Sequence, residues 1–403
     1  MKKLIYTLAF VLVIHFTFNI DNCEAQWVQV SSGINTSMNI YSLIAIGSNI
    51  FAGSDSGVYF STNNGTSWTK TALNNKIVYS LAAVGNVLYA GTGSSGVLSS
   101  PNNGANWTQT SMNTQTVYSL LVNGNIIFAG ASGNGVYYTT TSGTSWVLTN
   151  LGSHTVLSLA ASGTNIYAGT SLAGIYRSTN NGVNWAQTSM SSSSFKSLAI
   201  SSSYYYAGAY SLSGSNGIYR STDGGSWTLV GLNSINVLAL IASGNYIFAG
   251  TDNGIYESTN YGTNWIIKNQ GITTVPHMEA LLIPNNYVFA GSNGASVWRR
   301  PLEDFIGIKN ISTEIPSEYS LSQNYPNPFN PTTNIRFEIP KSGNVNLVVI
   351  DALGREIETL VNEKQSAGIY EATFDASAYP SGVYFYKLTT DGFNETKRMI
   401  LIK

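Results

Sequence analysis

Two aspartates in equivalent turns are the first candidates in this chain for acid–base chemistry. Asp55 stands in Gly53-Ser-Asp-Ser-Gly57, and Asp252 stands in Gly250-Thr-Asp-Asn-Gly254. Hydrolysis of a glycosidic bond needs two carboxyl groups roughly 5–10 Å apart, one of them with a raised pKa. Turn chemistry alone also explains an aspartate between two glycines, because its carboxylate bonds nearby backbone N–H groups. We expect Asp55 and Asp252 to lie on a ligand-binding face and assign no catalytic residue.

The histidines and the single cysteine offer little further chemistry. His154 and His277 lack acidic or cysteine partners at the spacing that metal ligands show. Cys23 precedes the expected cleavage point after Ala25, so the mature chain is expected to carry no thiol. We therefore expect no metal and no cofactor.

A repeat with seven Phe/Tyr-Ala-Gly steps positions these residues. Its glycines are spaced by 38, 39, 39, 39, 42 and 41 residues: Gly53, Gly91, Gly130, Gly169, Gly208, Gly250 and Gly291. A period near 40 with glycine and aromatic punctuation is typical of β-propeller blades. The sequence predicts an all-β fold with a seven-bladed β-propeller over residues 26–301. In a closed ring, Asp55 and Asp252 would have blade seven between them, too far apart to flank one bond.

Each repeat reads as four strands, and the seventh repeat lacks its last one. In blade two, the apolar run 78–84 predicts the inner strand, and three further strands follow it up to residue 110. Blade seven stops at Pro301, whereas Trp27-Val-Gln-Val-Ser matches the outer strand that begins at Trp107. We predict that the N-terminal segment pairs into blade seven and closes the ring.

The turn before each outer strand resembles the Asp-box of sialidase-like and sortilin-like propellers. It reads Ser61-Thr-Asn63-Asn-Gly65-Thr-Ser-Trp68 in blade one, with asparagine in place of aspartate; blade five keeps Asp223. The resemblance implies a folding element on the face away from the ligand site. An Asx side chain caps its own turn while the indole packs between blades. We expect structural roles for seven tryptophans: Trp27, Trp68, Trp107, Trp146, Trp185, Trp227 and Trp265.

The residues that a sialidase mechanism requires are not gathered in this sequence. Such a mechanism needs an arginine cluster for the substrate carboxylate and a Tyr/Glu nucleophile pair. Arg177 and Arg220 occupy one equivalent third-strand position, at the end of the blade away from the ligand face. Acidic residues on that ligand face are few, namely Asp55, Asp252 and Glu279. We expect a protein that is not an enzyme, with a polysaccharide-active glycoside hydrolase as the alternative.

Irregularities in the repeat suggest where a ligand would bind. Blade five inserts residues 209–216 into its second-to-third-strand loop, and the passage 269–278 into blade seven is the longest of its kind. Loops tolerate insertion cheaply, so drift is one explanation. The other is a raised rim around a shallow site, with Tyr210 as a stacking platform for a sugar or peptide and His277 beside it.

Charge and hydropathy divide the chain into parts. Residues 27–300 carry 8 Lys/Arg and 5 Asp/Glu, whereas residues 301–403 carry 9 and 13. The first part has no basic stripe, which argues against nucleic acid as a partner. Residues 1–25 combine Lys2 and Lys3 with a short apolar run and read as a signal peptide. We take 26–301 as the propeller, 302–318 as a linker and 319–403 as a second domain.

The C-terminal part is similar to the type A sorting domain of the type IX secretion system. Its alternating runs alone predict a small immunoglobulin-like β-sandwich. The residues that carry the resemblance occur in order along the chain: Pro326, Asn327, Pro328, Gly354, Gly382 and Lys397. The resemblance implies export across the outer membrane of a Gram-negative bacterium, with the secretion machinery and its sortase as partners of residues 319–403.

Together these features favour a binding protein that is secreted or displayed on the cell surface. We expect an adhesin-like monomer whose propeller binds a glycan or a protein. A glycoside hydrolase and a purely structural surface protein are the two alternatives.

Overall fold

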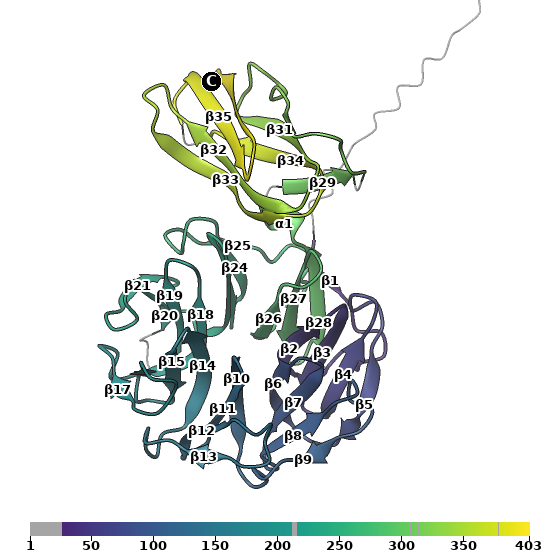
Figure 1. Cartoon of the computed structure of the whole chain (residues 1–403), viewed down its shortest axis with the longest axis vertical. Helices are drawn as coiled ribbons and strands as arrows, with labels where there is room; N and C mark the ends of the chain where they lie inside the picture. Colours follow the sequence, from purple (N-terminus) through teal and green to yellow (C-terminus); the bar gives the residue numbers. More distant parts are fainter. Residues whose placement is uncertain (1–25, 212–215, 307, 313, 378) are drawn as a thin grey trace, which may run out of the picture.

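The computed structural model describes residues 26–211, 216–306, 308–312, 314–377 and 379–403. The signal peptide predicted for residues 1–25 lies outside the described residues, as do residues 212–215 of the blade-five insertion. Two β-domains follow one another along the chain, a propeller and a sandwich (Figure 1). Within the described part of the chain, no helix is long and apolar enough to cross a membrane.

Seven four-stranded antiparallel sheets form the blades of the propeller. The inner strands are β2 (Ile40–Ile46), β6 (Val78–Val84), β10 (Val117–Asn123), β14 (Val156–Ser162), β18 (Ser194–Ile200), β22 (Val237–Ser243) and β26 (Met278–Leu282). The second strands are β3 (Asn49–Ser54), β7 (Val87–Thr92), β11 (Ile126–Ala131), β15 (Asn165–Thr170), β19 (Tyr205–Tyr210), β23 (Tyr246–Thr251) and β27 (Tyr287–Ser292). The third strands are β4 (Gly57–Ser61), β8 (Val97–Ser100), β12 (Gly135–Thr139), β16 (Ile175–Ser178), β20 (Gly217–Ser221), β24 (Gly254–Ser258) and β28 (Val297–Pro301). The outer strands are β5 (Thr69–Asn74), β9 (Thr108–Gln109), β13 (Val147–Leu148), β17 (Ala186–Gln187), β21 (Thr228–Gly231), β25 (Ile266–Ile267) and β1 (Val28–Gln29).

The N-terminal strand closes the ring, as the sequence predicts. β1 pairs antiparallel with β28 and is the fourth strand of blade seven. The Trp27 side chain is 2% exposed, and its indole N–H donates to the carbonyl of Lys268 at 2.6 Å. The indole also packs against Phe305 of helix α1 (Glu303–Ile306), with 5.8 Å between ring centroids. The segments at both ends of the propeller therefore meet in one apolar cluster.

The glycine of each Phe/Tyr-Ala-Gly step is required by the contact between blades. At Gly130, a Cβ would lie 2.3 Å from Ser119 Oγ of the same blade and 2.7 Å from Val156 Cγ1 of the next blade. The six equivalent glycines face similar obstruction, with nearest atoms at 2.3–2.6 Å. Real Cβ contacts are not this short, so only glycine lets the second strand approach the neighbouring inner strand this closely. The signature thus records how closely the blades pack.

The turns before the outer strands are held by hydrogen bonds of their own side chains. In blade one, Asn63 Oδ1 accepts from the backbone N–H of Ser67 at 2.9 Å, and the Ser61 hydroxyl accepts from the N–H of Gly65 at 2.9 Å. The Trp68 indole N–H then donates to the carbonyl of Val30, on the blade-seven side, at 2.8 Å. Each turn is closed by its own polar side chains. In blade one, the tryptophan ties that turn to the adjacent blade.

The C-terminal domain is a sandwich of two four-stranded sheets. One sheet has the order β29 (Ile308–Ser312), β34 (Gly368–Asp375), β31 (Thr332–Ile339) and β30 (Ser320–Leu321). The other has the order β33 (Glu356–Gln365), β32 (Gly343–Ile350), β35 (Gly382–Thr390) and β36 (Asn394–Leu401). Phe337, Leu347 and Phe374 are fully buried between them. The segment 302–318 includes helix α1 against the propeller and strand β29 at the edge of the sandwich.

Candidate functional site

The candidate site is a ring of seven side chains at one mouth of the central channel of the propeller. Every inner strand has a register shift near its start, where one residue is skipped in the pairing with the second strand. Such β-bulges re-aim a side chain and are frequent beside binding sites. The skipped residues of blades one to seven are Tyr41, Tyr79, Tyr118, Leu157, Lys196, Leu238 and Glu279, and these seven line one cavity of about 210 Å³.

The three tyrosines form an aromatic arc across blades one to three. Ring centroids lie 5.2 Å apart between Tyr41 and Tyr79 and 5.0 Å apart between Tyr79 and Tyr118. The rings are tilted at 58° and 46° to each other, and both separations lie within the 4.5–7 Å that aromatic pairs favour. Burial raises the pKa of the Tyr41 and Tyr79 phenols above their ordinary value of 10.0. Tyr41 and Tyr79 therefore present neutral phenols at physiological pH.

An ion pair crosses the other side of the channel mouth. Lys196 Nζ lies 2.5 Å from Glu279 Oε2, and the two residues come from blades five and seven, which are not adjacent. Leu238, from the blade between them, is 3% exposed and lines the same cavity. The glutamate side chain is 7% exposed and the lysine side chain 35%. The carboxylate is thus almost buried, whereas the ammonium remains open to solvent.

The predicted residue Tyr210 lies beside this ring. It ends β19, and Lys196 Nζ stands 5.7 Å from the centre of the Tyr210 ring, within the range of a cation–π contact. The structure therefore brings Tyr210 to the rim of the cavity through Lys196. Its use as a stacking platform stays a prediction.

Asp55 and Asp252 have equivalent partners in their own blades. Asp55 Oδ2 accepts from the backbone N–H of Asn39 at 3.4 Å, and Asp252 Oδ2 accepts from the Asn236 side-chain amide at 2.8 Å. Asn39 and Asn236 each stand immediately before an inner strand, and Asn39 donates to the Tyr41 hydroxyl at 3.3 Å. Asp55 thus holds the residue that bonds Tyr41, and neither aspartate lines the cavity.

The remaining predicted ligand residue, His277, is exposed and stands two residues before Glu279. Its carbonyl accepts from the backbone N–H of Asn293 at 2.9 Å. Asp55, Asp252 and His277 therefore share the end of the propeller where the inner strands begin. We call this end the entrance face.

Sequence reasoning singled out Glu279 on this face but missed the ring that it completes. Lys196 was overlooked because a single lysine in an inner strand has no partner nearby in sequence. The available signal is the repeat itself. When the seven units are aligned on their glycines, the position twelve residues before each glycine reads Tyr, Tyr, Tyr, Leu, Lys, Leu, Glu, a column in which five of seven residues are aromatic or charged.

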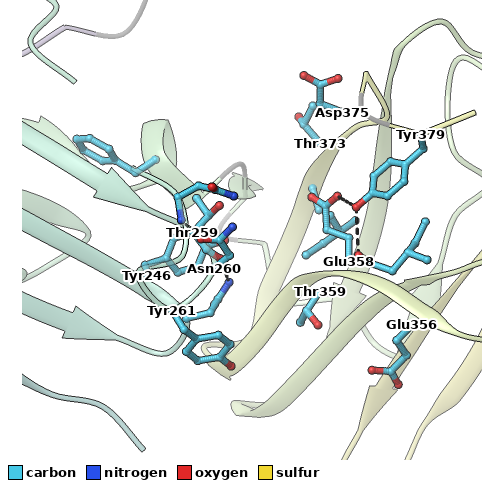
Figure 2. A pocket seen from close by; sticks show the side chains of 16 residues that line it. Tyr246, Thr259, Asn260, Tyr261, Glu356, Glu358, Thr359, Thr373, Asp375 and Tyr379 are labelled. Atoms are coloured by element: carbon cyan, nitrogen blue, oxygen red, sulfur yellow. Dashed lines mark hydrogen bonds between the residues drawn. The ribbon is translucent and has the colours of Figure 1, made fainter. Parts of the chain in front are cut away.

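A second cleft lies at the opposite end of blade six, between the propeller and the sandwich (Figure 2). It has a volume of about 710 Å³; Asn260 and Tyr261 line the propeller side, facing Glu358 and Tyr379 of the sandwich. Burial raises the pKa of Glu358, whose carboxylate accepts a 3.1 Å hydrogen bond from the Tyr379 hydroxyl. All carboxylates of this cleft come from the sandwich. The propeller residues of this cleft lie in or next to turns at the end of blade six that is opposite the start of its inner strand. The sandwich therefore stands at the end of the propeller away from the entrance face.

The residues that carry the sorting-domain resemblance serve the sandwich fold. Asn327 Oδ1 accepts from the N–H of Ile400 at 3.0 Å, and the carbonyl of Pro326 accepts from the Thr333 hydroxyl at 2.8 Å. Gly354 has φ of 80° in the turn that follows β32. The other three residues are placed as follows: Pro328 in the loop before β31, Gly382 at the start of β35 and Lys397 in β36, 2.9 Å from Glu395.

Two family models match the chain. Residues 15–116 and 166–284 match the DUF6242 beta propeller domain, and residues 323–403 match the secretion system C-terminal sorting domain. The search of curated proteins gave no match.

Solved structures with a similar fold have low sequence identity to the chain. PorZ, described as an essential bacterial surface component of the type-IX secretion system of Porphyromonas gingivalis, is 12% identical with a TM-score of 0.54, and the match covers 92% of this chain and 60% of PorZ. The GH74 xyloglucanase from Xanthomonas campestris is 15% identical with a TM-score of 0.55, covering 78% of this chain and 59% of the enzyme. YCF48, solved bound to D1 peptide, is 15% identical with a TM-score of 0.56, covering 70% of this chain and 98% of YCF48. At these identities the likeness concerns the fold alone.

Proposed function

The chain belongs to the DUF6242 β-propeller family and ends in a secretion sorting domain, and from this premise we propose that its propeller binds an extracellular ligand at the channel mouth. The sorting domain makes it a secreted or cell-surface protein. Our proposal adds an adhesin-like role, with a glycan or a protein as ligand and a monomer as the working form.

One observation carries the proposal. All seven inner strands direct their skipped residue into the same cavity, so each blade contributes one side chain to the ring. A β-bulge leaves one residue without a partner in the strand pairing and changes the direction of its side chain. Such an interruption weakens the sheet locally but can point a side chain into a cavity. The ring combines an aromatic arc with one charged pair, the mixture of apolar walls and few polar groups that ligand sites show.

The relatives are compatible with both ligand classes. The xyloglucanase is named for activity on a polysaccharide, and YCF48 was solved with a peptide. Both classes of ligand therefore belong in the first binding experiment.

We further infer that the turns before the outer strands are variants of the Asp-box, with asparagine in place of aspartate. The amide oxygen of Asn63 accepts the backbone N–H four residues on, and Asn102, Asn180 and Asn260 do the same at 2.9 Å. These turns lie away from the entrance face. In this proposal their tryptophans support the blades and leave ligand binding to the ring.

For delivery, we propose that residues 1–25 act as a signal peptide and that the sorting domain then directs passage through the type IX machinery of a Gram-negative bacterium, including its sortase. Deletion of residues 319–403 is expected to leave the propeller in the periplasm. Normal appearance of the truncated protein outside the cell would contradict this route. A variant lacking only residues 1–25 should stay in the cytoplasm and serves as the control.

The alternative is a glycoside hydrolase. Of the described residues that line the cavity, Glu279 is the only carboxylate, and it is paired with Lys196. Glycoside hydrolysis ordinarily uses two carboxyl groups at the bond. Release of reducing sugar from polysaccharides by the purified protein, abolished by Glu279→Gln, would replace binding with hydrolysis. A purely structural role predicts no ligand at all.

The test of the binding proposal uses glycan and peptide arrays with the purified protein. We expect a ligand class whose signal falls by tenfold or more for Tyr79→Ala and for Lys196→Met. Leu172→Ala is the matched control, because Leu172 is 77% exposed in the turn between β15 and β16, also on the entrance face, and lies outside the ring. Loss of signal in the control as well, or full binding by both ring variants, would refute a site at the channel mouth.

A further inference from the structure

We infer that the ring binds one uncharged sugar unit. This unit would be the terminal residue of a neutral glycan, which enters the channel mouth with that end first. This inference rests on the proposed binding function and specifies its ligand. It follows from three features of the ring: its charge, its size and its hydrogen-bonding groups.

The two charged side chains of the ring form an ion pair with each other. Lys196 and Glu279 form a pair at 2.5 Å, and the five other members of the ring are tyrosines and leucines. An anionic ligand would have to draw the ammonium away from a carboxylate that is 7% exposed, and a cationic ligand would have to displace the lysine. Leaving an almost buried charge without its partner is costly. A neutral ligand avoids both penalties.

The cavity has the size of a single small unit. Its volume is about 210 Å³. Pockets that enclose drug-sized ligands measure roughly 300–1,000 Å³. One sugar ring at the end of a longer chain fits this scale, with the rest of the chain on the entrance face.

The walls of the cavity match the two kinds of surface that a sugar ring presents. The aromatic arc supplies apolar ring surface for the C–H face of a pyranose. The ammonium has three donors and the carboxylate has several acceptor positions, so the pair retains capacity for hydroxyl groups. Charge-assisted bonds of this kind are among the stronger hydrogen bonds. The ring therefore offers stacking on one side and directed polar contacts on the other.

One phenol is already fixed in position. The Tyr41 hydroxyl accepts from the Asn39 amide at 3.3 Å, and Asp55 holds the Asn39 backbone. A side chain restrained before binding loses less conformational entropy when the ligand arrives. The entrance face is also free of the sandwich, which lines the cleft at the opposite end of blade six. Among the described residues, the sandwich therefore leaves the site uncovered.

The experiment measures the dissociation constants of three sets of probes by calorimetry with the purified full chain. The sets are neutral oligosaccharides of glucose, galactose, mannose and xylose; anionic oligogalacturonate and sialyllactose; and hexapeptides with charged or aromatic ends. We expect at least one neutral oligosaccharide to bind, with a dissociation constant that changes less than twofold between about 0.05 and 1 M salt, because no net charge is screened.

Variants locate that binding. Tyr79→Ala is expected to weaken it about tenfold through loss of an aromatic contact, and Tyr79→Phe by less than fivefold. Leu172→Ala should leave it unchanged. Thermal unfolding of each variant shows whether the propeller remains folded, and Tyr79→Phe keeps the packing of the arc if Tyr79→Ala does not fold.

The outcomes separate the two proposals. Binding of anionic sugars or peptides that is lost in the ring variants overturns the neutral-sugar inference and leaves the binding function intact. Binding of a neutral sugar that is indifferent to Tyr79→Ala overturns the assignment of the ring. Absence of binding by every probe at millimolar concentration contradicts both.

Discussion

Replacement of Trp27 tests whether the N-terminal strand is what closes the propeller. Its indole is 2% exposed, contacts Phe305 and donates to the Lys268 carbonyl at 2.6 Å. Truncation of a buried tryptophan to alanine costs about 3–5 kcal/mol. For a domain of 150–250 residues, each kcal/mol lowers Tm by about 2–4 °C. The propeller is somewhat larger, so the lower end of this scale applies and Trp27→Ala should lower its Tm by about 6–10 °C.

Differential scanning calorimetry measures this loss, with two controls built into the chain. Trp185→Ala removes a half-buried tryptophan whose indole N–H bonds within its own turn, at the carbonyl of Gly182, so a smaller loss of about 1–2 kcal/mol is expected. The sandwich has a separate core, and its transition should not move. Equal losses for Trp27→Ala and Trp185→Ala, or a Tm change below about 3 °C for Trp27→Ala, would show that ring closure does not depend on this residue.

Two further substitutions test the packing and the turns. Gly130→Ala should cost about 1–3 kcal/mol by overpacking, because its Cβ would lie 2.3 Å from Ser119 Oγ, whereas Gly392→Ala has nothing within 4 Å. Denaturant titration compares the two, and equal values would refute the packing argument. Backbone N–H groups of Ser226 and Gly225 lower the pKa of Asp223 from 3.8 to about 2, so its stabilisation is present above pH 3.8 and is lost as pH falls through about 2. Asp223→Asn should match the wild type at pH 7 within about 1 kcal/mol, since Asp223 is exposed. The variant should lose less stability between pH 4 and 2; identical Tm–pH curves would contradict this explanation.

The architecture could be predicted from the sequence because the same packing constraint acts on the same residue of every repeat. The glycine at each Phe/Tyr-Ala-Gly step is obstructed by the neighbouring blade, so the spacing of these glycines counted the blades. The match between Trp27 and the later outer strands predicted the closing strand, and the pairing of β1 with β28 confirms it. Both signals survive in sequence because each repeat meets the same physical constraint.

The site was less predictable because it depends on register and on contacts between distant repeats. The run Val78-Tyr-Ser-Leu reads as a continuous apolar strand, and nothing in one repeat shows that Tyr79 is skipped in the ladder. Lys196 and Glu279 stand 83 residues apart and meet only because the ring is closed. The repeat irregularities did lead to Tyr210, which lies beside Lys196. Asp55 and Asp252 were candidates for acid–base chemistry, but in the structure each accepts a hydrogen bond from an asparagine of its own blade.

The bulge at the start of every inner strand separates the residue that lines the cavity from the residues that pair with the second strand. The residues on either side of Tyr79, namely Val78 and Ser80, are buried against neighbouring strands, whereas Tyr79 itself stands outside the ladder. A change at a skipped position would therefore alter the cavity and leave the strand pairing of its own blade in place. Seven such positions, one in each blade, converge on a single cavity. The propeller is in this sense a scaffold whose strand pairing does not use the seven side chains that line its cavity.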